Sequence, residues 1–216
     1  MTLHVRKATE ADLQGIAEVG VAAFNPKTDA IVRHLFPEHL RPTNPADEDS
    51  TVKWRYTRKG IKLRSENILL MVVVDDALDD KIVGFSMWEV PTDMVEEEPA
   101  GEYKPVVPCP GLDESAYDDL RRITGQATKD CFGEKGSKKL WYLDYLGVHP
   151  DQQRRGIGKM LLDWGVDAAH KEKRDAFLIA TPAGVPLYKA RGFEEMKTFP
   201  LFTEPHVVMI RRFEKQ

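Results

Sequence analysis

Apolar positions along this chain repeat with two different periods, and each change of period predicts a change of secondary structure. Between Leu13 and Phe24 they lie three and four residues apart, which is typical of one face of a helix. Thr9 and Asp12 form a variant of the capping box that begins a helix. The same criteria predict strands at 3–6, 68–74, 81–90, 140–148, 176–180, 193–198 and 207–212, and helices at 31–36, 46–62, 114–128, 156–170 and 184–191.

The segment 140–148 is apolar on both faces, so we expect it in the centre of a sheet. It is followed by a helix and a further buried strand, a succession that predicts a parallel βαβ unit. If the strand keeps a period of two throughout, Tyr142, Asp144, Leu146 and Val148 share one face. No internal repeat interrupts this order, and 216 residues suit a single domain.

The composition excludes several classes of protein. Hydrophobic residues make up 42% and charged residues 31% of the chain, as in ordinary globular proteins. A net charge of −4 provides no global cationic field, so we expect no nucleic-acid or membrane partner. The longest apolar runs fall far short of the ~20 residues of a membrane span, and the first residues lack the apolar core of a signal peptide. We therefore expect a cytoplasmic protein, with Cys109 and Cys131 as reduced thiols and no metal site.

A polar turn that bears two glycines leads from the strand at 140–148 into the helix at 156–170. The first amides of a helix lack internal acceptors and lie at the positive end of its dipole, so they bind anions. Gly156 and Gly158 would let a phosphate approach the backbone, and nearby basic side chains add positive charge. A P-loop would need a glycine at position 151, and a dinucleotide fingerprint would need one at 161. Asp151 and Leu161 occupy those positions, so neither motif fits.

The spacing Gln153-x-x-Gly156-x-Gly158, after a Leu-x-Val strand end, resembles the pyrophosphate-binding motif of the GNAT superfamily of N-acetyltransferases. A second segment, in which Tyr188 precedes Gly192-Phe193, is similar to a later motif of that superfamily. The order of predicted elements also fits. The resemblance implies one α/β domain over 1–216, with a mixed, mostly antiparallel sheet splayed around a coenzyme cleft and flanked by helices. It also implies acetyl-CoA as co-substrate, no metal, and a substrate-side insertion at 91–138.

The resemblance assigns roles to individual residues. Tyr188 would protonate the leaving CoA thiolate. The amine must lose a proton before or during attack, and Asp144 is the leading candidate for the base, with Glu89 second. A carboxylate paired for structural reasons is the alternative for both. We expect Phe24, Trp88 and Tyr142 to contact the acceptor. The coenzyme would be held by the strand end and the turn, namely by Leu146, Gly147, Val148, Gln153, Arg154, Arg155, Gly156, Ile157, Gly158 and Lys159.

These features predict acetyl transfer to a primary amine of a small molecule or peptide, by direct attack in a ternary complex. A non-catalytic acyl-CoA-binding or sensor module of the same fold is one alternative, and an N-acyltransferase that uses a longer acyl-CoA is another. The chain would act as a monomer or homodimer. Residues 92–120 hold nine acids and one base. This stretch is either a solvated loop or a lid that attracts a cationic acceptor, such as a polyamine, an aminoglycoside-like amine or a basic peptide end.

Overall fold

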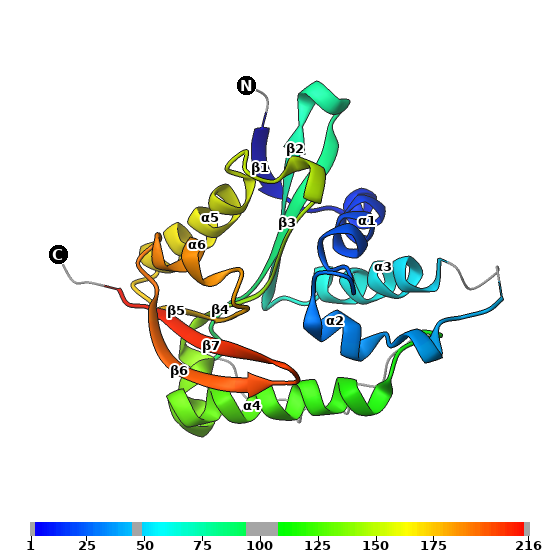
Figure 1. The fold of residues 1–216 in the computed structure, drawn as a ribbon. Coiled ribbons are helices and arrows are strands. Elements are labelled where there is room, and N and C mark those ends of the chain that lie inside the picture. The colour runs from blue at the N-terminus through cyan, green and yellow to red at the C-terminus, as the bar shows by residue number, and fades with distance from the viewer. Residues whose placement is uncertain (1–2, 45–48, 94–107, 214–216) are drawn as a thin grey trace.

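The computed structural model describes residues 3–44, 49–93 and 108–213, which build one seven-stranded sheet (Figure 1). The strand order is β1-β2-β3-β4-β5-β7-β6, and only the β4–β5 pair is parallel. The strands are β1 (Leu3–Lys7), β2 (Ile68–Asp75), β3 (Lys81–Glu89), β4 (Trp141–Val148), β5 (Ala176–Ala180), β6 (Glu194–Leu201) and β7 (Glu204–Arg211). The predicted mixed, mostly antiparallel sheet is confirmed, with β4 in its centre.

The helices cover both faces of this sheet. The α-helices of the described residues are α1 (Leu13–Ala23), α2 (Ala30–Leu35), α3 (Ser50–Leu63), α4 (Glu114–Gly136), α5 (Ile157–Lys171) and α6 (Val185–Lys189). Helix α1 packs between α3 and the sheet, α5 lies across β1 to β4, and α4 runs along β6 and β7 (Figure 1). Helix α4 is longer than the helix predicted at 114–128: it continues to Gly136, about two further turns. It changes direction at Gly133, whose φ of 73° is not helical.

Strand β2 shows why the sequences of the central strands are apolar at nearly every position. Leu70 and Val72 pack in the cluster that contains α1, whereas Met71 and Val73 pack against residues of α5. Because successive side chains of a strand point to opposite faces, a strand covered on both sides must be apolar at every position. These two layers place α1 and α5 on opposite faces of the sheet.

The predicted Thr9–Asp12 pair caps the short 3-10 turn at Glu10–Asp12 that leads into α1. The Asp12 carboxylate accepts hydrogen bonds from the Thr9 amide at 2.7 Å and from Thr9 Oγ1 at 2.9 Å. It also accepts two bonds from the Arg6 guanidinium, at 2.7 and 2.8 Å. These bonds from Arg6, and then those from Thr9, lower the pKa of Asp12 to about 2 although burial opposes them. The carboxylate thus ties β1 to the first turn ahead of α1.

The expectation that β4 keeps a strict period of two is wrong. Met87 of β3 faces Tyr145, whereas the next residue, Trp88, faces Leu143, so Asp144 is an extra residue without a partner on β3. This β-bulge shifts the alternation by one residue. Leu146 and Val148 consequently pack on the α5 face, and Tyr142 lies on the opposite face.

Candidate active site

Strands β4 and β5 separate halfway along β4. Their parallel pairing covers only Trp141–Leu143 against Ala176–Leu178, while the other edge of β4 stays paired with β3 as far as Val148. From Asp144 to Val148, the edge of β4 that faces β5 is thus left open. An open strand edge can pair with an extended ligand as if with a further strand. Leu146, Gly147 and Val148, three of the residues expected to hold the coenzyme, lie on this edge.

The turn after β4 ends at the N-terminus of α5. Arg154 and Gly156 both have positive φ, 61° and 83°, and no side chain caps the helix. A β-carbon on Gly156 would have no atom within 4 Å, and one on Gly158 would come no closer than 3.5 Å to Leu187. The protein therefore leaves open space over Gly156, and at Gly158 it leaves room for about one methyl group, beside amides that lack helical acceptors. Ile157 and Lys159 lie in the same first turn, and this arrangement fits the pyrophosphate of a coenzyme.

Two side chains of the turn are engaged with the protein itself. The Arg155 guanidinium donates a hydrogen bond of 2.7 Å to Asp75, which is 1% exposed, and a further bond to Gln152. The Gln153 amide nitrogen lies 3.4 Å from the Val148 carbonyl. Arg155 thus neutralises a buried carboxylate and holds the turn against β2, so its contribution to an anion comes from its backbone amide.

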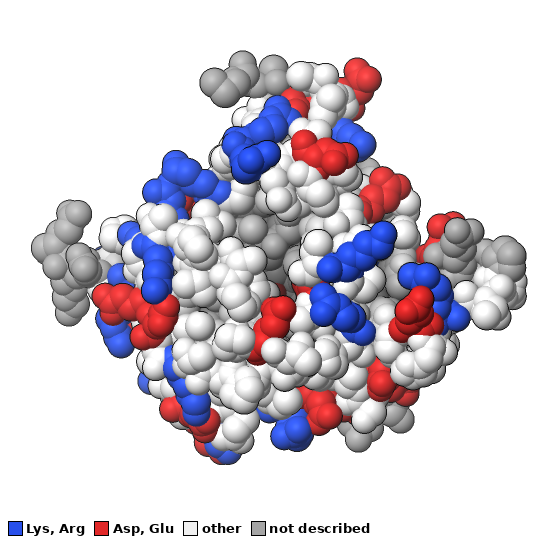
Figure 2. Space-filling view, in the orientation of Figure 1, with Lys and Arg blue, Asp and Glu red and all other residues white. Residues whose placement is uncertain are grey.

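A cavity of about 480 Å³ opens beside the gap between β4 and β5. Figure 2 shows a hollow near the middle of the face, between the α6 side and the side of α1 and α2, with Lys and Arg side chains on one rim. Its wall includes the expected site residues Asp144, Tyr188, Phe24 and Tyr142, together with Leu146. Residues from the end of α1, from β4 and from α6 therefore meet at one cavity next to the open edge of β4.

The bulged residue Asp144 is the carboxylate of β4 at this cavity. Burial raises its pKa, and the positive charge of Lys59 opposes that rise. Lys59 is itself 7% exposed, and burial lowers its pKa. Its ammonium group lies 3.5 Å from the centre of the Tyr145 ring. A carboxylate whose pKa is raised toward neutrality is suited to accept a proton near neutral pH.

Tyr188 reaches the cavity from α6. Its ring packs edge-on against Phe193, and a β-carbon on Gly184 would lie 2.8 Å from its Cε2. Burial raises the pKa of Tyr188 to about 12, so the phenol stays protonated at neutral pH. The tyrosine is thus positioned by its neighbours and holds a proton that it can donate.

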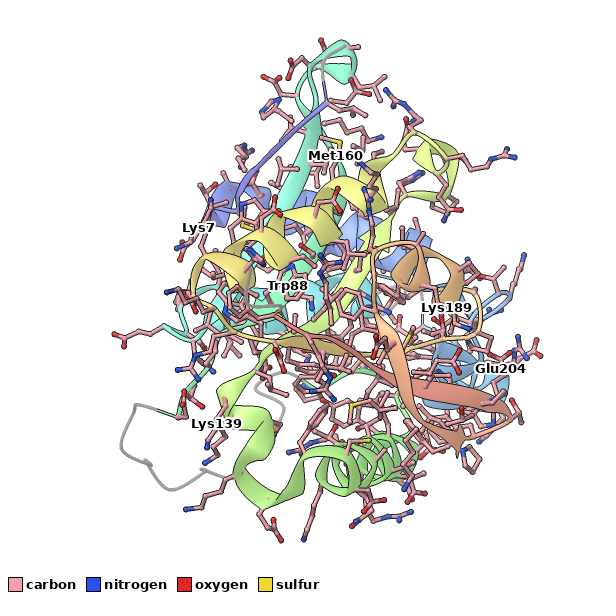
Figure 3. All side chains as sticks on the ribbon, turned by 90° about the vertical axis from the view of Figure 1, so that its left-hand side faces the viewer. Lys7, Trp88, Lys139, Met160, Lys189 and Glu204 are labelled. Atoms are coloured by element: carbon pink, nitrogen blue, oxygen red, sulfur yellow. The ribbon has the colours of Figure 1, made fainter. Side chains whose placement is uncertain are left out.

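Of the six residues expected to catalyse the reaction or to contact the acceptor, two do not line this cavity. Trp88 is fully buried between Trp141 and α5, where an added β-carbon on Gly165 would lie 2.0 Å from its ring (Figure 3). The expectation that Trp88 contacts the acceptor is therefore wrong, because the ring fills the core. Glu89 lies 3.4 Å from the Lys62 ammonium and lines a neighbouring cavity instead.

Three of the five described acids of the 92–120 stretch have partners away from the cavity, and the other two, Glu114 and Asp118, are exposed and do not line it. Asp93 forms an ion pair with Arg174 at 3.0 Å, and Asp119 forms one with Arg122. Asp113 accepts a hydrogen bond from the Ala116 amide and so caps α4. None of these three lines the cavity, and Glu96, Glu97, Glu98, Glu102 lie outside the described residues. An electrostatic lid for a cationic acceptor finds no support in the part of the chain that is described.

Neither cysteine takes part in this cavity, and the described residues hold no cluster of metal ligands. Cys109 and Cys131 are free, and burial raises the pKa of Cys109 to about 11. Neither lines the cavity. Within 3–44, 49–93 and 108–213, no cluster of three or more His, Cys, Asp or Glu side chains could hold a metal ion. No helix in those ranges is long and apolar enough to cross a membrane.

The sequence prediction missed a group of cavity residues on α3 and β7. Trp54, Arg55, Arg58 and Lys59 come from α3, and His206 comes from β7. The basic residues of α3 recur three and four apart, which is the spacing of one helix face. That spacing is a signal in the sequence, but a basic face is usually a solvated one.

Comparisons with known proteins agree with this geometry. Residues 115–195 match the family model described as an acetyltransferase (GNAT) domain. A protein named "Acetyltransferase" from Stachybotrys chartarum is 29% identical over 195 residues, which are 88% of this chain and 80% of that protein.

Solved structures of similar fold cover the whole chain. The histone acetyltransferase HPA2 and related acetyltransferase structure from Corynebacterium glutamicum has a TM-score of 0.62 at 20% identity, covering 100% of this chain and 99% of that one. The PaiA N-acetyltransferase from Thermoplasma acidophilum, in complex with coenzyme A, has a TM-score of 0.56 at 14% identity, covering 99% and 100%. At these identities the likeness concerns the fold.

Proposed function

We propose that this chain is an acetyltransferase of the GNAT superfamily, the family whose model matches residues 115–195, and that it transfers the acetyl group of acetyl-CoA to a primary amine by direct attack in a ternary complex. The acceptor is a small molecule or a peptide end. The chain would work as a monomer or homodimer in the cytoplasm, with no metal, nucleic-acid or membrane partner.

The separation of β4 from β5 carries this proposal. It leaves the edge of β4 from Asp144 to Val148 open, between the anion-binding turn at Gly156 and the cavity lined by Asp144 and Tyr188. A pantetheine arm paired with this edge would bring the thioester to the cavity. The PaiA protein, whose structure has a similar fold, was solved in complex with coenzyme A, which supports coenzyme A as the ligand.

Each side chain then has one task. The amine nitrogen attacks the thioester carbon, forming the C–N bond while the C–S bond breaks. Asp144 accepts the proton that the ammonium group must lose, directly or through water. Tyr188 donates its phenolic proton to the departing thiolate. The turn at Arg154–Lys159 neutralises the pyrophosphate and fixes the position of the thioester.

A thiol-release assay with acetyl-CoA and a broad amine library tests this function. Tyr188→Phe removes only the hydroxyl group and should lower kcat by about 10²–10⁴, as expected for loss of a general acid. Tyr56→Phe is the matched control, since Tyr56 is 42% exposed and lies outside the cavity. Calorimetry with coenzyme A should give equal affinity for all three proteins.

The alternatives give different results in the same assay. Tight binding of coenzyme A without thiol release for any amine would indicate a non-catalytic acyl-CoA-binding or sensor module. Faster turnover of a longer acyl-CoA than of acetyl-CoA would identify an N-acyltransferase of longer chains. Full activity of Tyr188→Phe would exclude Tyr188 as the acid.

A further inference from the structure

Helix α3 presents a row of basic side chains to the cavity. Arg55, Arg58, Lys59 and Lys62 follow one another at the spacing of a single helix face, and all four line the cavity, with Arg121 of α4. The acids of the described lining are Asp29 and Asp144. The charge of the wall is therefore positive, opposite to that expected for a site that attracts a polycation.

Arg55 is the most unusual member of this row. It is 9% exposed, and no carboxylate of the described residues lies within ion-pair distance of it. Its Nε has no hydrogen-bond partner, and its guanidinium lies 5.6 Å from the ring centre of Phe24. Buried arginines are rarely left without an anion, because desolvation of the charge is costly. A guanidinium that is buried at a cavity wall without an anionic partner is suited to bind an anionic group of a ligand.

Two other nitrogen atoms of the same wall are also buried without a partner. They are Nε1 of Trp54, a donor, and Nε2 of His206, whose residues are 5% and 1% exposed. Most buried polar atoms in proteins have a hydrogen-bond partner. His206 Nδ1 lies 3.3 Å from the Glu204 carbonyl oxygen, which can only accept, so Nδ1 carries the proton and Nε2 of the neutral ring is an acceptor. Nε of Arg55 and Nε1 of Trp54 are thus donors without a partner at this wall.

Along α3, the lysine that acts on Asp144 and the arginine that has no anion are different residues. Lys59 lies over Tyr145, and its charge acts on Asp144, whereas Arg55 is one helical turn away beside Phe24. A helical turn spans about 5.4 Å, which is comparable to the reach of a small bifunctional molecule. Apolar rings also line the cavity beside Arg58, where Phe36 and Trp54 are in edge-on contact and the Arg58 guanidinium lies 4.6 Å from the centre of the Trp54 ring.

We propose that the acceptor is an amine that also carries a carboxylate, bound by the guanidinium groups of Arg55 and Arg58 while its amine faces Asp144. The class that fits is that of amino acids with an apolar side chain. This inference rests on the proposed acetyl transfer to an amine and adds the identity of the acceptor's second group.

Matched acceptors test the carboxylate directly. L-Phenylalanine, L-phenylalaninamide and phenethylamine share a ring and an amine and differ at the carboxylate, and L-leucine, L-leucinamide and isoamylamine repeat the comparison. With saturating acetyl-CoA, and with rates corrected for the free-amine fraction, kcat/KM for at least one acid should exceed that of its amide and its amine by about tenfold or more, as charge-assisted bonds to a fork of donors predict.

Variants of α3 assign the preference to Arg55. Arg55→Met keeps much of the side chain's volume and should remove about tenfold or more of kcat/KM for the acid, while the amine changes by about twofold or less. Arg55→Lys restores the charge without the planar fork and should recover part of the loss. Lys53→Met is the control, since it removes a charge from an exposed position of the same helix outside the cavity. If Arg55→Met does not fold by circular dichroism, Arg58→Met provides the same comparison.

Binding without turnover separates this inference from the proposed function. N-acetyl-L-phenylalanine should bind the coenzyme A complex about tenfold or more tightly than N-acetylphenethylamine by calorimetry, and Arg55→Met should abolish that difference. If no amine gives thiol release but this difference in affinity is observed, the proposed transfer reaction is wrong and the carboxylate site at Arg55 is still supported. Equal kcat/KM values for acid, amide and amine would overturn the inference, and so would an equal loss of kcat/KM for all three in Arg55→Met. Faster turnover of succinyl-CoA than of acetyl-CoA, with no preference among acceptors, would also overturn it, because the arginines would then bind a carboxylate of the acyl group.

Discussion

The indole ring of Trp88 lies directly against the backbone of Gly165 in α5, so closely that a β-carbon on Gly165 would fall 2.0 Å from Cε2 of the ring. Trp88 is fully buried and packs edge-on against Trp141, with ring centres 6.2 Å apart. The tryptophan therefore sets the distance between α5 and the sheet. Because α5 begins at the turn proposed to bind the pyrophosphate, this contact also positions that turn.

Gly165→Ala should destabilise the fold. Overpacking a dense core costs about 1–3 kcal/mol, and a 2.0 Å contact with a fully buried ring belongs at the upper end. The better helix propensity of alanine returns about 1 kcal/mol, so we expect a net loss of about 2 kcal/mol. Urea unfolding followed by circular dichroism measures the change.

Gly125→Ala in α4 is the matched control for that substitution. A β-carbon there would have no neighbour within 4 Å, so the variant should gain about 0.5–1 kcal/mol from helix propensity alone. An equal gain in Gly165→Ala would contradict the contact with Trp88.

The position of Trp88 in the core illustrates what could and could not be predicted from the sequence. The apolar run of β3 correctly indicates a buried strand, but it does not say which helix lies over each face. The partner, Gly165, is a small residue on a helix predicted from its period alone. Only the packing of α5 on β3 reveals that the ring fills the space left by a missing side chain, and so belongs to the core.

Asp144 shows the same limit for the candidate site. The sequence predicts that Asp144 lies on a central strand, just before the proposed coenzyme motif. It does not predict the bulge that leaves Asp144 without a partner on β3, because a bulge depends on the register between two strands. The turn at Gly156, by contrast, follows local rules for glycine and helix starts. The basic face of α3 has a clear helical spacing. Its role depends on α4 and β7, which are distant in sequence, closing the cavity around it.

Gly158→Ala should impair coenzyme binding without harming the fold. The nearest protein atom to the new methyl group would be Leu187 Cδ2 at 3.5 Å, an ordinary contact, so the melting temperature should stay within about 2 °C. The methyl group would occupy space above the first amides of α5, and coenzyme A should bind about tenfold or more weakly. Calorimetry and thermal unfolding on one sample separate the two effects. Unchanged affinity would contradict the placement of the pyrophosphate.

Asp12→Asn should destabilise the protein in a pH-dependent way. The pKa of Asp12 is lowered to about 2 from 3.8, mainly by the Arg6 hydrogen bonds. A lowered pKa stabilises the fold fully above the unfolded value, and this contribution is lost as the pH falls from about 5 toward 2. Since Arg6 is 38% exposed, we expect a loss of about 1–2 kcal/mol at pH 7.

Unfolding free energies measured from pH 7 to pH 3 test this expectation. The difference between the wild-type protein and Asp12→Asn should shrink on acidification, whereas Asp79→Asn, a change at an exposed turn, should leave the whole curve unchanged. A pH-independent difference would mean that Asp12 contributes through packing in place of charge.

The choice between Asp144 and Glu89 as the base can be made from the pH profile. Burial raises the pKa of Asp144, so kcat/KM should rise with pH along a limb whose midpoint lies above the usual range of aspartate. Asp144→Asn should lower kcat/KM by about 10²–10⁴ and remove this limb, because no carboxylate remains to accept the proton. Glu89→Gln removes the contact with Lys62 and should keep the limb but move it to lower pH, because the charge of Glu89 raises the pKa of Asp144. Retention of the limb in Asp144→Asn, with its loss in Glu89→Gln, would transfer the role of base to Glu89.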